Sequence, residues 1–162
     1  RLDILVNNAA VFPRTPLGEV TAEGWDAIFA VNLRAPFLLA QAAAPLMHQG
    51  GGGRIVNLAD ISAERPFPGY IPYCVSKAGL IALTRGLAKA LAPDVLVNAI
   101  APGTVLWPVD YPVEGREREL RRTPLKRTGT PEDVARAVLF LLEGADFVTG
   151  QVLALDGGRS LT

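Results

Sequence analysis

The chain has 162 residues, of which 49% are hydrophobic and 20% are charged, and its formal net charge is zero. This composition predicts one soluble globular domain with a sizeable core. The balanced charge argues against nucleic acid or an anionic membrane as a main partner, because neither would gain counterion release on binding.

Metal and disulfide chemistry have few residues to use in this sequence. Cys74 is the single cysteine and His48 the single histidine. An internal disulfide is therefore excluded, no zinc site is expected, and we expect a reducing cytoplasm as the location. The longest apolar stretch, Ala35 to Met47, is too short to span a bilayer, and no signal segment opens the chain.

The first predicted element is a buried parallel strand over Asp3 to Asn8, where an apolar run enters a polar turn. Thr21 is a suitable cap for the helix that follows, which carries acidic residues in its first turn. Trp25, Phe29 and Leu33 recur along that helix at the spacing of core residues.

The same helix is expected to continue to about Met47, with an interruption at Pro36. Proline lacks an N–H and clashes with the carbonyl four residues earlier, which belongs to Asn32. The sequence therefore predicts a kink and a free backbone acceptor at Asn32. The glycine run over 50–53 follows a helix and precedes a strand, whereas phosphate-binding loops follow a strand, so we interpret the run as a helix stop and turn.

The middle of the chain predicts a buried strand over Arg54–Leu58 and then a loop that carries Asp60. The next helix presents Tyr73 and Lys77 on one face, because they are four residues apart. An ammonium beside a phenol favours the phenolate, so we expect Lys77 to lower the pKa of Tyr73. Asp60 lies where open α/β sheets place ligands, and we expect these three side chains to form one proton-transfer site.

The remaining chain also alternates helices with strands, which predicts a parallel sheet covered by helices, without repeats or a second domain. Thr130 is the expected cap of the last helix, and the charge run over 114–127 is interpreted as a solvated helical face. The expected elements are helices over Val75–Leu91 and Glu132–Leu142, strands over Val95–Ile100 and Gln151–Asp156, and an irregular to weakly helical segment over Leu106–Arg127.

Four motifs in this order resemble the short-chain dehydrogenase/reductase family. They are the Asn-Asn-Ala-Ala turn at 7–10, Val-Asn-Leu at 31–33, the Tyr-x-x-x-Lys pair at 73–77 and Ala-Pro-Gly at 101–103. Ala10 replaces the glycine that is usual in the first of them. The resemblance implies an α/β fold with a Rossmann-like, doubly wound parallel sheet, and an oxidoreductase that uses a nicotinamide cofactor.

The resemblance also implies a role for each matching residue. Tyr73 would be the general acid, Lys77 would lower its pKa and hold the nicotinamide ribose, and the carbonyl of Asn32 would hold a water in the proton relay. The cofactor contacts would come from Asn8 and Ala9 at the adenosine-side ribose and from Pro102, Gly103 and Val105 at the nicotinamide.

One departure from the family pattern bears on the substrate. Most members carry a serine thirteen residues before the tyrosine, and this chain has Asp60 there. A carboxylate cannot donate a hydrogen bond to a carbonyl unless it is protonated, but it suits a heterocycle rich in N–H groups. Ser62 is an alternative donor, although its spacing to Tyr73 is wrong.

The pteridine reductases of this family carry the same aspartate. Phe12 stands where those enzymes stack an aromatic ring on the pterin, and simple core packing is the other interpretation of this residue. Trp107 either walls the substrate pocket or anchors the loop after Gly103. The resemblance to bacterial pteridine reductases implies reduction of dihydropterins or dihydrofolate with NADPH, by Tyr73 and Asp60.

The resemblance begins at the family's fourth strand. The glycine-rich turn that binds the pyrophosphate, and the residue that selects NAD or NADP, precede that strand in the family. Residues 1–162 thus match the C-terminal portion of a single domain, truncated at its N-terminus, and we expect this portion alone to turn over little.

Two alternatives stay open. One is a reductase of another carbonyl, such as a 3-oxoacyl thioester, with Asp60 as an unusual replacement. The other is a non-catalytic fragment that serves as an assembly module. Family members pair through the helix that bears the tyrosine and through the last strand, so a homo-oligomer, a dimer or a tetramer, is implied for the full-length protein.

Overall fold

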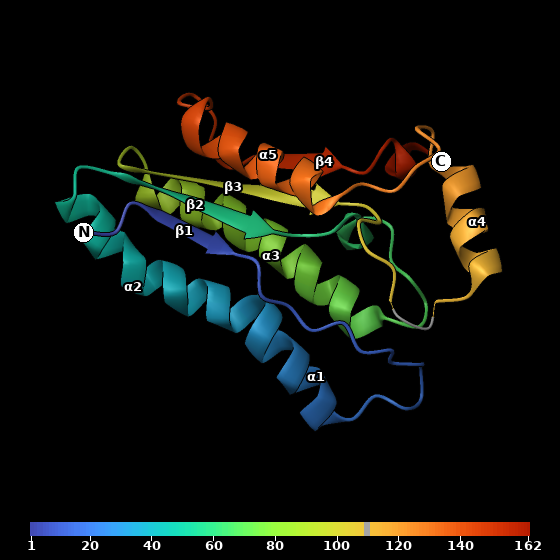
Figure 1. Cartoon of the computed structure of the whole chain (residues 1–162). Coiled ribbons are helices and arrows are strands. Elements are labelled where there is room, and N and C mark those ends of the chain that lie inside the picture. The colour runs from blue at the N-terminus through green and yellow to red at the C-terminus, as the bar shows by residue number, and fades with distance from the viewer. Residues whose placement is uncertain (109–110) are drawn as a thin grey trace.

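The computed structural model describes residues 1–108 and 111–162. Within them, four parallel strands form one sheet in the order β1 (Ile4–Asn7), β2 (Gly53–Leu58), β3 (Val95–Pro102) and β4 (Val152–Leu155) (Figure 1). The helices are α1 (Ala22–Phe29), α2 (Ala35–Gln49), α3 (Ile71–Leu91), α4 (Val113–Arg122) and α5 (Pro131–Glu143), with short turns η1 (Ala30–Arg34), η2 (Ile61–Ala63) and η3 (Arg159–Leu161).

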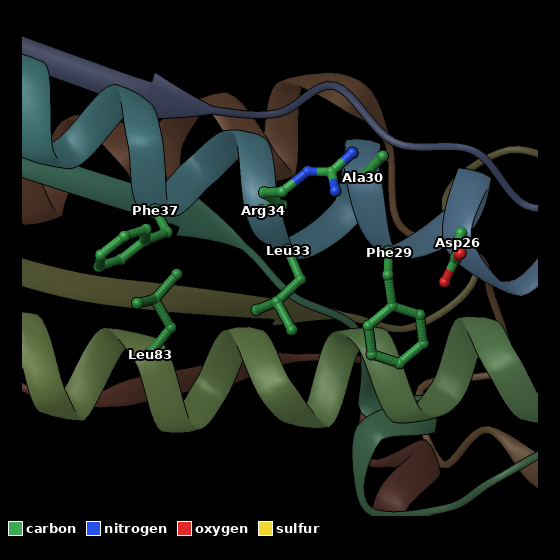
Figure 2. Close-up of a pocket in the computed structure, with 7 residues that line it drawn as sticks. All are labelled: Asp26, Phe29, Ala30, Leu33, Arg34, Phe37 and Leu83. Atoms are coloured by element: carbon green, nitrogen blue, oxygen red, sulfur yellow. The ribbon is translucent and has the colours of Figure 1, made fainter.

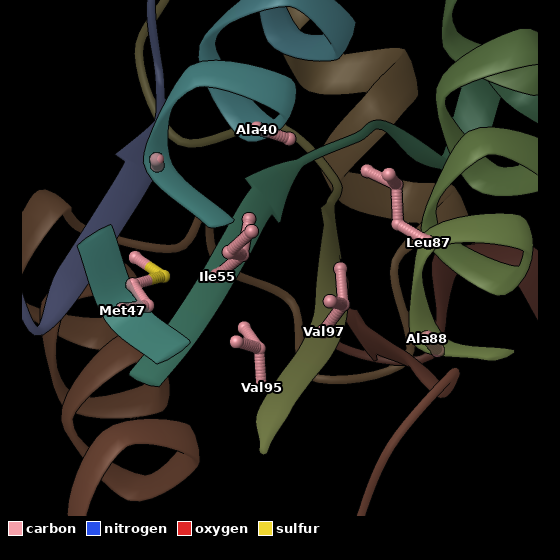
Figure 3. Packing of buried hydrophobic residues seen from close by; sticks show 8 residues of the cluster. Ala40, Met47, Ile55, Leu87, Ala88, Val95 and Val97 are labelled. Carbon is pink, nitrogen blue, oxygen red and sulfur yellow. The ribbon is translucent and has the colours of Figure 1, made fainter. Parts of the chain in front are cut away.

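The predicted α/β fold is confirmed, because helices cover both faces of the sheet. Alternate residues of a strand point to opposite faces. Ile55 and Val97 face α2 and α3, where they pack with Met47 and Leu87 (Figure 3). The opposite face packs against α5 through Val56, Leu58 and Ile100 of the strands and Ala137 and Leu141 of the helix.

Two helix starts follow their predicted caps. The Thr21 hydroxyl accepts a hydrogen bond from the backbone N–H of Gly24 at 3.1 Å. At α5, Thr130 and Asp133 form a reciprocal capping box, which satisfies two backbone donors that the first turn of a helix leaves free. The predicted bounds of the strands and of α5 agree with the structure to within two residues.

The interruption near Pro36 takes the form of a π-helical turn rather than a break. Residues 30–34 widen into η1, and α2 begins at Ala35 with Pro36 in its first turn. A π turn shifts the hydrogen-bond pattern by one residue, and such turns are frequent at functional sites. The predicted free carbonyl at Asn32 stays a prediction.

The spacing of Trp25, Phe29 and Leu33 does not place them in the core, and that expectation was wrong. Trp25 stacks on Phe29 with ring centroids 4.6 Å apart. Phe29 and Leu33 line an open groove between α1–α2 and α3 (Figure 2). Helical spacing identifies a common face but not what covers that face.

The glycine run over 50–53 is a turn, as predicted. Gly52 has a φ of +122°, which disfavours other residues, and the Cβ of any other residue at Gly53 would lie 2.6 Å from the Met47 side chain. The turn therefore lets α2 pack directly on the start of β2.

The charge run lies on α4, a regular helix with no buried residue. The predicted solvated face is therefore confirmed, whereas the segment is more regularly helical than predicted. Residues 109 and 110 of the predicted irregular segment lie outside the described residues.

In the described residues, the helical stretch Ala22–Gln49 is long and apolar enough to cross a membrane by length and composition alone. The length argument drawn from Ala35–Met47 therefore does not extend to this longer stretch. In the fold, α2 packs against β1, β2 and α3, and its outer face exposes Phe37, Leu38 and Leu39.

Candidate active site

The predicted site residues gather at the carboxyl ends of the strands, where parallel α/β sheets bind ligands. Asp60 follows β2, and Asn8 and Ala9 follow β1. Tyr73 and Lys77 lie in the first two turns of α3. The chain thus brings residues from three elements to one edge of the sheet.

Asp60 and Tyr73 are in direct contact. The Tyr73 hydroxyl donates a hydrogen bond to Oδ2 of Asp60 at 2.8 Å. The other carboxylate oxygen accepts from the backbone N–H of Ser62 at 2.7 Å, which makes Asp60 the N-cap of η2. Both oxygens are therefore oriented, one by the backbone and one by the phenol.

Lys77 is the third member of the group. Its Nζ donates to the backbone carbonyl of Leu58 at 2.7 Å and lies 5.7 Å from the centre of the Tyr73 ring. The side chain is 3% exposed, and an ammonium has further N–H donors beyond the one that Leu58 uses. The proton-transfer group of Asp60, Tyr73 and Lys77 is thus assembled as the sequence predicted, at the level of geometry.

The expected direction of the Tyr73 pKa was wrong. Burial raises the pKa of Tyr73 far above its ordinary value, and the Asp60 carboxylate raises it further. Burial lowers the pKa of Lys77 to about 8, against an opposing effect of Asp60. The hydroxyl therefore stays protonated at neutral pH, because both desolvation and the adjacent anion disfavour the phenolate.

Asn32 holds the loop after β1 against α3. Its Oδ1 accepts from the N–H of Val11 at 2.9 Å, and its Nδ2 donates to the Val11 carbonyl at 3.0 Å. The same Nδ2 lies 3.1 Å from Oγ of Ser76, which donates to the Tyr73 carbonyl at 2.6 Å. The side chain of Asn32, almost fully buried, therefore positions both the loop and the start of α3.

Phe12 lies beside the proton-transfer group and outside the aliphatic core. Its ring centre is 4.4 Å from that of Tyr73 in an edge-on arrangement, and 4.3 Å from that of Tyr70 in a parallel stack. The side chain is 43% exposed. The core-packing interpretation of Phe12 is therefore wrong, and its ring lies exposed next to Tyr73.

Ser62 does not serve as the alternative donor. Its side chain is 0% exposed, and its Oγ has no hydrogen-bond partner among the described residues. A hydroxyl enclosed in this way cannot reach a substrate without a rearrangement of η2.

The residues expected to touch a cofactor lie at the same edge of the sheet. Asn8 and Ala9 are exposed, while Pro102, Gly103 and Val105 are half-buried. The N–H of Gly103 donates to the Leu155 carbonyl at 3.1 Å. A Cβ at this glycine would lie 2.9 Å from Cβ of Asp156, so only glycine lets the loop after β3 approach β4 this closely.

Trp107 packs on its own segment. Its ring stacks on Tyr111 with centroids 5.0 Å apart, and the Arg116 guanidinium lies 5.9 Å from the indole. Arg116 also donates to the Tyr111 carbonyl at 3.1 Å. These contacts favour the anchoring interpretation over a wall of the substrate pocket.

Three residues with contacts at or beneath the site were missed from the sequence: Ser76, Tyr70 and Asn57. Ser76 lies at a variable position of the Tyr-x-x-x-Lys motif, so the motif assigns it no role. Tyr70 is far from Phe12 in the sequence, with α1, α2 and β2 between them. Asn57 accepts from Nδ2 of Asn7 at 2.8 Å and donates to the Thr84 hydroxyl at 2.9 Å. An asparagine inside an apolar strand run is the one signal that pointed to such a buried polar layer.

Two shallow apolar grooves lie away from these residues, along α2 and α3. One, of about 420 Å³, is lined in part by Phe29, Leu33 and Leu83 (Figure 2). The other, of about 450 Å³, continues from Phe37 toward Asp94. Neither groove includes a residue of the proton-transfer group.

The comparisons with known proteins agree with this geometry. A family model described as enoyl-(acyl carrier protein) reductase matches residues 1–160. The chain belongs to the short-chain dehydrogenase/reductase family. The Tyr73–Lys77 pair stands where the Tyr-x-x-x-Lys motif of this family lies.

The family relatives include a 3-oxoacyl-[acyl-carrier-protein] reductase of Thermotoga maritima, 41% identical over 98% of this chain and 66% of its own length. Human dehydrogenase/reductase SDR family member 4 is 41% identical over 97% of this chain and 59% of its own. The crystal structure of a gluconate 5-dehydrogenase from Burkholderia cenocepacia, in complex with NADP and tartrate, superposes with a TM-score of 0.94. It is 33% identical and is matched over 99% of this chain and 66% of its own. The chain therefore spans less than two thirds of the length of these short-chain relatives.

Proposed function

We propose that the complete gene product reduces a C=N or C=O bond with NADPH, and that Tyr73 donates the proton. Residues 1–162 would then be the C-terminal portion of a single catalytic domain. When bound, NADPH supplies a hydride. The chain's own part would be to hold a protonated hydroxyl beside the reacting atom, and the Tyr73 hydroxyl, which donates to Asp60 in this structure, is the group proposed for it.

The residues at the sheet edge fit such a cofactor. Lys77 offers buried N–H groups toward a ribose, and Asn8 and Ala9 present exposed polar backbone beyond β1. The loop at Pro102 and Gly103 closes the same edge from β3. The gluconate 5-dehydrogenase with NADP has the same fold, which supports NADPH as the proposed cofactor.

The geometry favours a pterin, a dihydropterin or dihydrofolate, as the substrate. The observation that carries this proposal is the Asp60 carboxylate on the Tyr73 hydroxyl at 2.8 Å, beside the exposed ring of Phe12. A carboxylate accepts from the amino and ring N–H groups of a pterin, and an aromatic face stacks on its flat bicycle. In the proposed step Tyr73 would turn its O–H from Asp60 to the ring nitrogen and protonate it, and water would return a proton to Tyr73, while Asp60 orients the substrate.

A 3-oxoacyl thioester is the second candidate, and the comparisons support it better than the pterin. The Thermotoga maritima relative acts, by its name, on a 3-oxoacyl group carried by acyl carrier protein. With such a substrate, Tyr73 would protonate the carbonyl oxygen. The negative charge of Asp60 would then oppose the developing alkoxide, which is why the site geometry favours the pterin.

Asp60→Ser separates the two candidates. The complete gene product and this variant are assayed for NADPH oxidation with dihydrobiopterin, dihydrofolate and an acetoacetyl thioester. A pterin reductase loses about 100-fold in kcat/KM on the pterin, whereas a thioester reductase keeps or gains activity. Asp60→Asn is the matched control, because it keeps the side-chain size and an acceptor for the Ser62 N–H while it removes the charge. Wild-type activity on the thioester alone would overturn the pterin proposal.

We also propose that the complete gene product is a homo-oligomer that covers the outer face of α2. Phe37, Leu38, Leu39 and Leu46 are each 44–51% exposed there, and exposed apolar patches mark interaction surfaces. Sedimentation of wild type and Leu39→Glu tests this, and a monomeric wild type would contradict it. A cytoplasmic location stays a prediction.

A further inference from the structure

Phe12 is held by a second aromatic ring that the proposed chemistry does not use. The ring of Tyr70 stacks on Phe12 with an interplanar angle of 8° and a centroid distance of 4.3 Å. The rings of Phe12 and Tyr73 form an edge-to-face pair, with centroids 4.4 Å apart and an interplanar angle of 70°. Because Phe12 is still 43% exposed, Tyr70 supports the ring without enclosing it.

The backbone on both sides of Phe12 is fixed as well. Val11 is bonded through its N–H and its carbonyl to the buried Asn32 side chain. Thr15 donates its N–H to the Gly69 carbonyl at 2.7 Å and forms a parallel bridge with Tyr70. Two loops that are far apart in the sequence are thus joined at the Phe12–Tyr70 stack, which we call the ring clasp.

Tyr70 itself is immobilised by the start of α3. Its N–H donates to the Phe67 carbonyl at 2.9 Å, and its own carbonyl accepts from the N–H of Cys74 at 3.0 Å. The ring of Phe67 approaches Tyr70 edge-on at 6.5 Å. The ring clasp is therefore anchored to the same helix that carries Tyr73, so the plane of Phe12 is fixed relative to the proton donor.

We propose that Tyr70 is a positioning residue that fixes the plane of Phe12 and thereby selects flat bicyclic substrates over open-chain ones. The inference rests on the proposed pterin function, since only a planar ring system needs a fixed stacking surface. A surface that is ordered before binding spares the substrate the entropic cost of ordering it. Tyr70 acts through Phe12 and not on the reacting atoms, so its loss should affect KM and leave proton transfer alone.

Tyr70→Ala, Tyr70→Leu and Tyr70→Phe in the complete gene product test this role. The Ala and Leu variants should raise KM for dihydrobiopterin about two- to tenfold. The pH profile of kcat and the KM for an acetoacetyl thioester should stay as in the wild type. Tyr70→Phe keeps the ring and should restore a wild-type KM. Trp25→Ala is the matched control, because it removes one ring of a stacked pair, Trp25 on Phe29, that is separate from the ring clasp.

Several outcomes would overturn the inference. An unchanged KM in Tyr70→Ala would do so, as would a Tyr70→Phe variant as impaired as Tyr70→Ala, or a shifted pH profile of kcat. If the wild type reduces only the thioester, the proposed pterin function fails by itself. Crystal structures of the complete wild type and Tyr70→Ala then decide the positioning role: a Phe12 ring that turns away supports it, and an unmoved ring refutes it.

Discussion

The two ends of the sheet are built from different interactions. At the amino ends of β2 and β3, Ile55, Val95 and Val97 pack with Met47 and Leu87 in a wholly aliphatic cluster (Figure 3). At the carboxyl ends many of the buried groups are polar and are joined by hydrogen bonds, among them Asn7, Asn32, Asn57, Ser76 and Lys77. One helix, α3, contributes to both ends.

The difference shows how the fold separates stability from chemistry. Apolar contacts are non-directional, so the aliphatic end depends on volume and tolerates similar shapes. Hydrogen bonds are directional, so each polar group depends on a specific partner, and an orphaned partner is costly. We therefore expect substitutions at the two ends to affect different measurements.

The largest expected effect is on activity, from Tyr73→Phe. Removing the hydroxyl removes the proposed acid, so kcat should fall about 10²- to 10⁴-fold. The melting temperature should hardly change, because water can reach the half-buried Asp60. Tyr111→Phe, which keeps its stack on Trp107, is the control. A matching loss of stability would mean that the two ends are not separable.

A core substitution should lower stability and leave activity unchanged. Ile55 is 0% exposed, and Ile55→Ala should lower the free energy of unfolding by about 2–5 kcal/mol, through lost burial and a cavity. Urea denaturation measures this, and kcat per folded molecule should stay constant. Ile55→Val should cost only about 0.5–1.5 kcal/mol; a lower kcat in either variant would contradict the comparison.

Substitutions in the polar layer beneath the site should cost less stability than Ile55→Ala, but their effects should be coupled. Asn57→Ala leaves the amide of Asn7 and the hydroxyl of Thr84 each without one partner, at a cost of about 1–3 kcal/mol. In a double-mutant cycle with Thr84→Val, the two effects should fail to add by about 0.5 kcal/mol or more. Strict additivity would show that the layer does not act as a network.

A further expected effect is a pH dependence of stability from Lys77. Its pKa in the folded chain is about 8 against an ordinary 10.5, so between these values the unfolded chain binds more protons. The free energy of unfolding should therefore rise with pH through that window, by at most about 1.4 kcal/mol per pH unit. Lys77→Met should flatten the curve measured by urea denaturation, and an equal slope in that variant would exclude Lys77 as the cause.

The pattern of residues predicted local structure well where the cause is local. Thr21 and Thr130 cap their helices as expected because capping depends on atoms within one turn. The contact of Asp60 with Tyr73 was predicted because a parallel sheet places the end of a strand beside the next helix. The prediction that Phe29 and Leu33 lie in the core failed because the cause is not local: helical spacing does not say what covers a face.

By itself, then, the sequence determined the alternation of elements, the order of the motifs and which three side chains, Asp60, Tyr73 and Lys77, would meet. Only the tertiary structure decided the direction of the Tyr73 pKa, because desolvation depends on everything that surrounds the ring. It alone also brought Tyr70 onto Phe12 and joined Asn32, Ser76 and the loop after β1. Those contacts join residues that are far apart in the chain, and spacing carries no information about them.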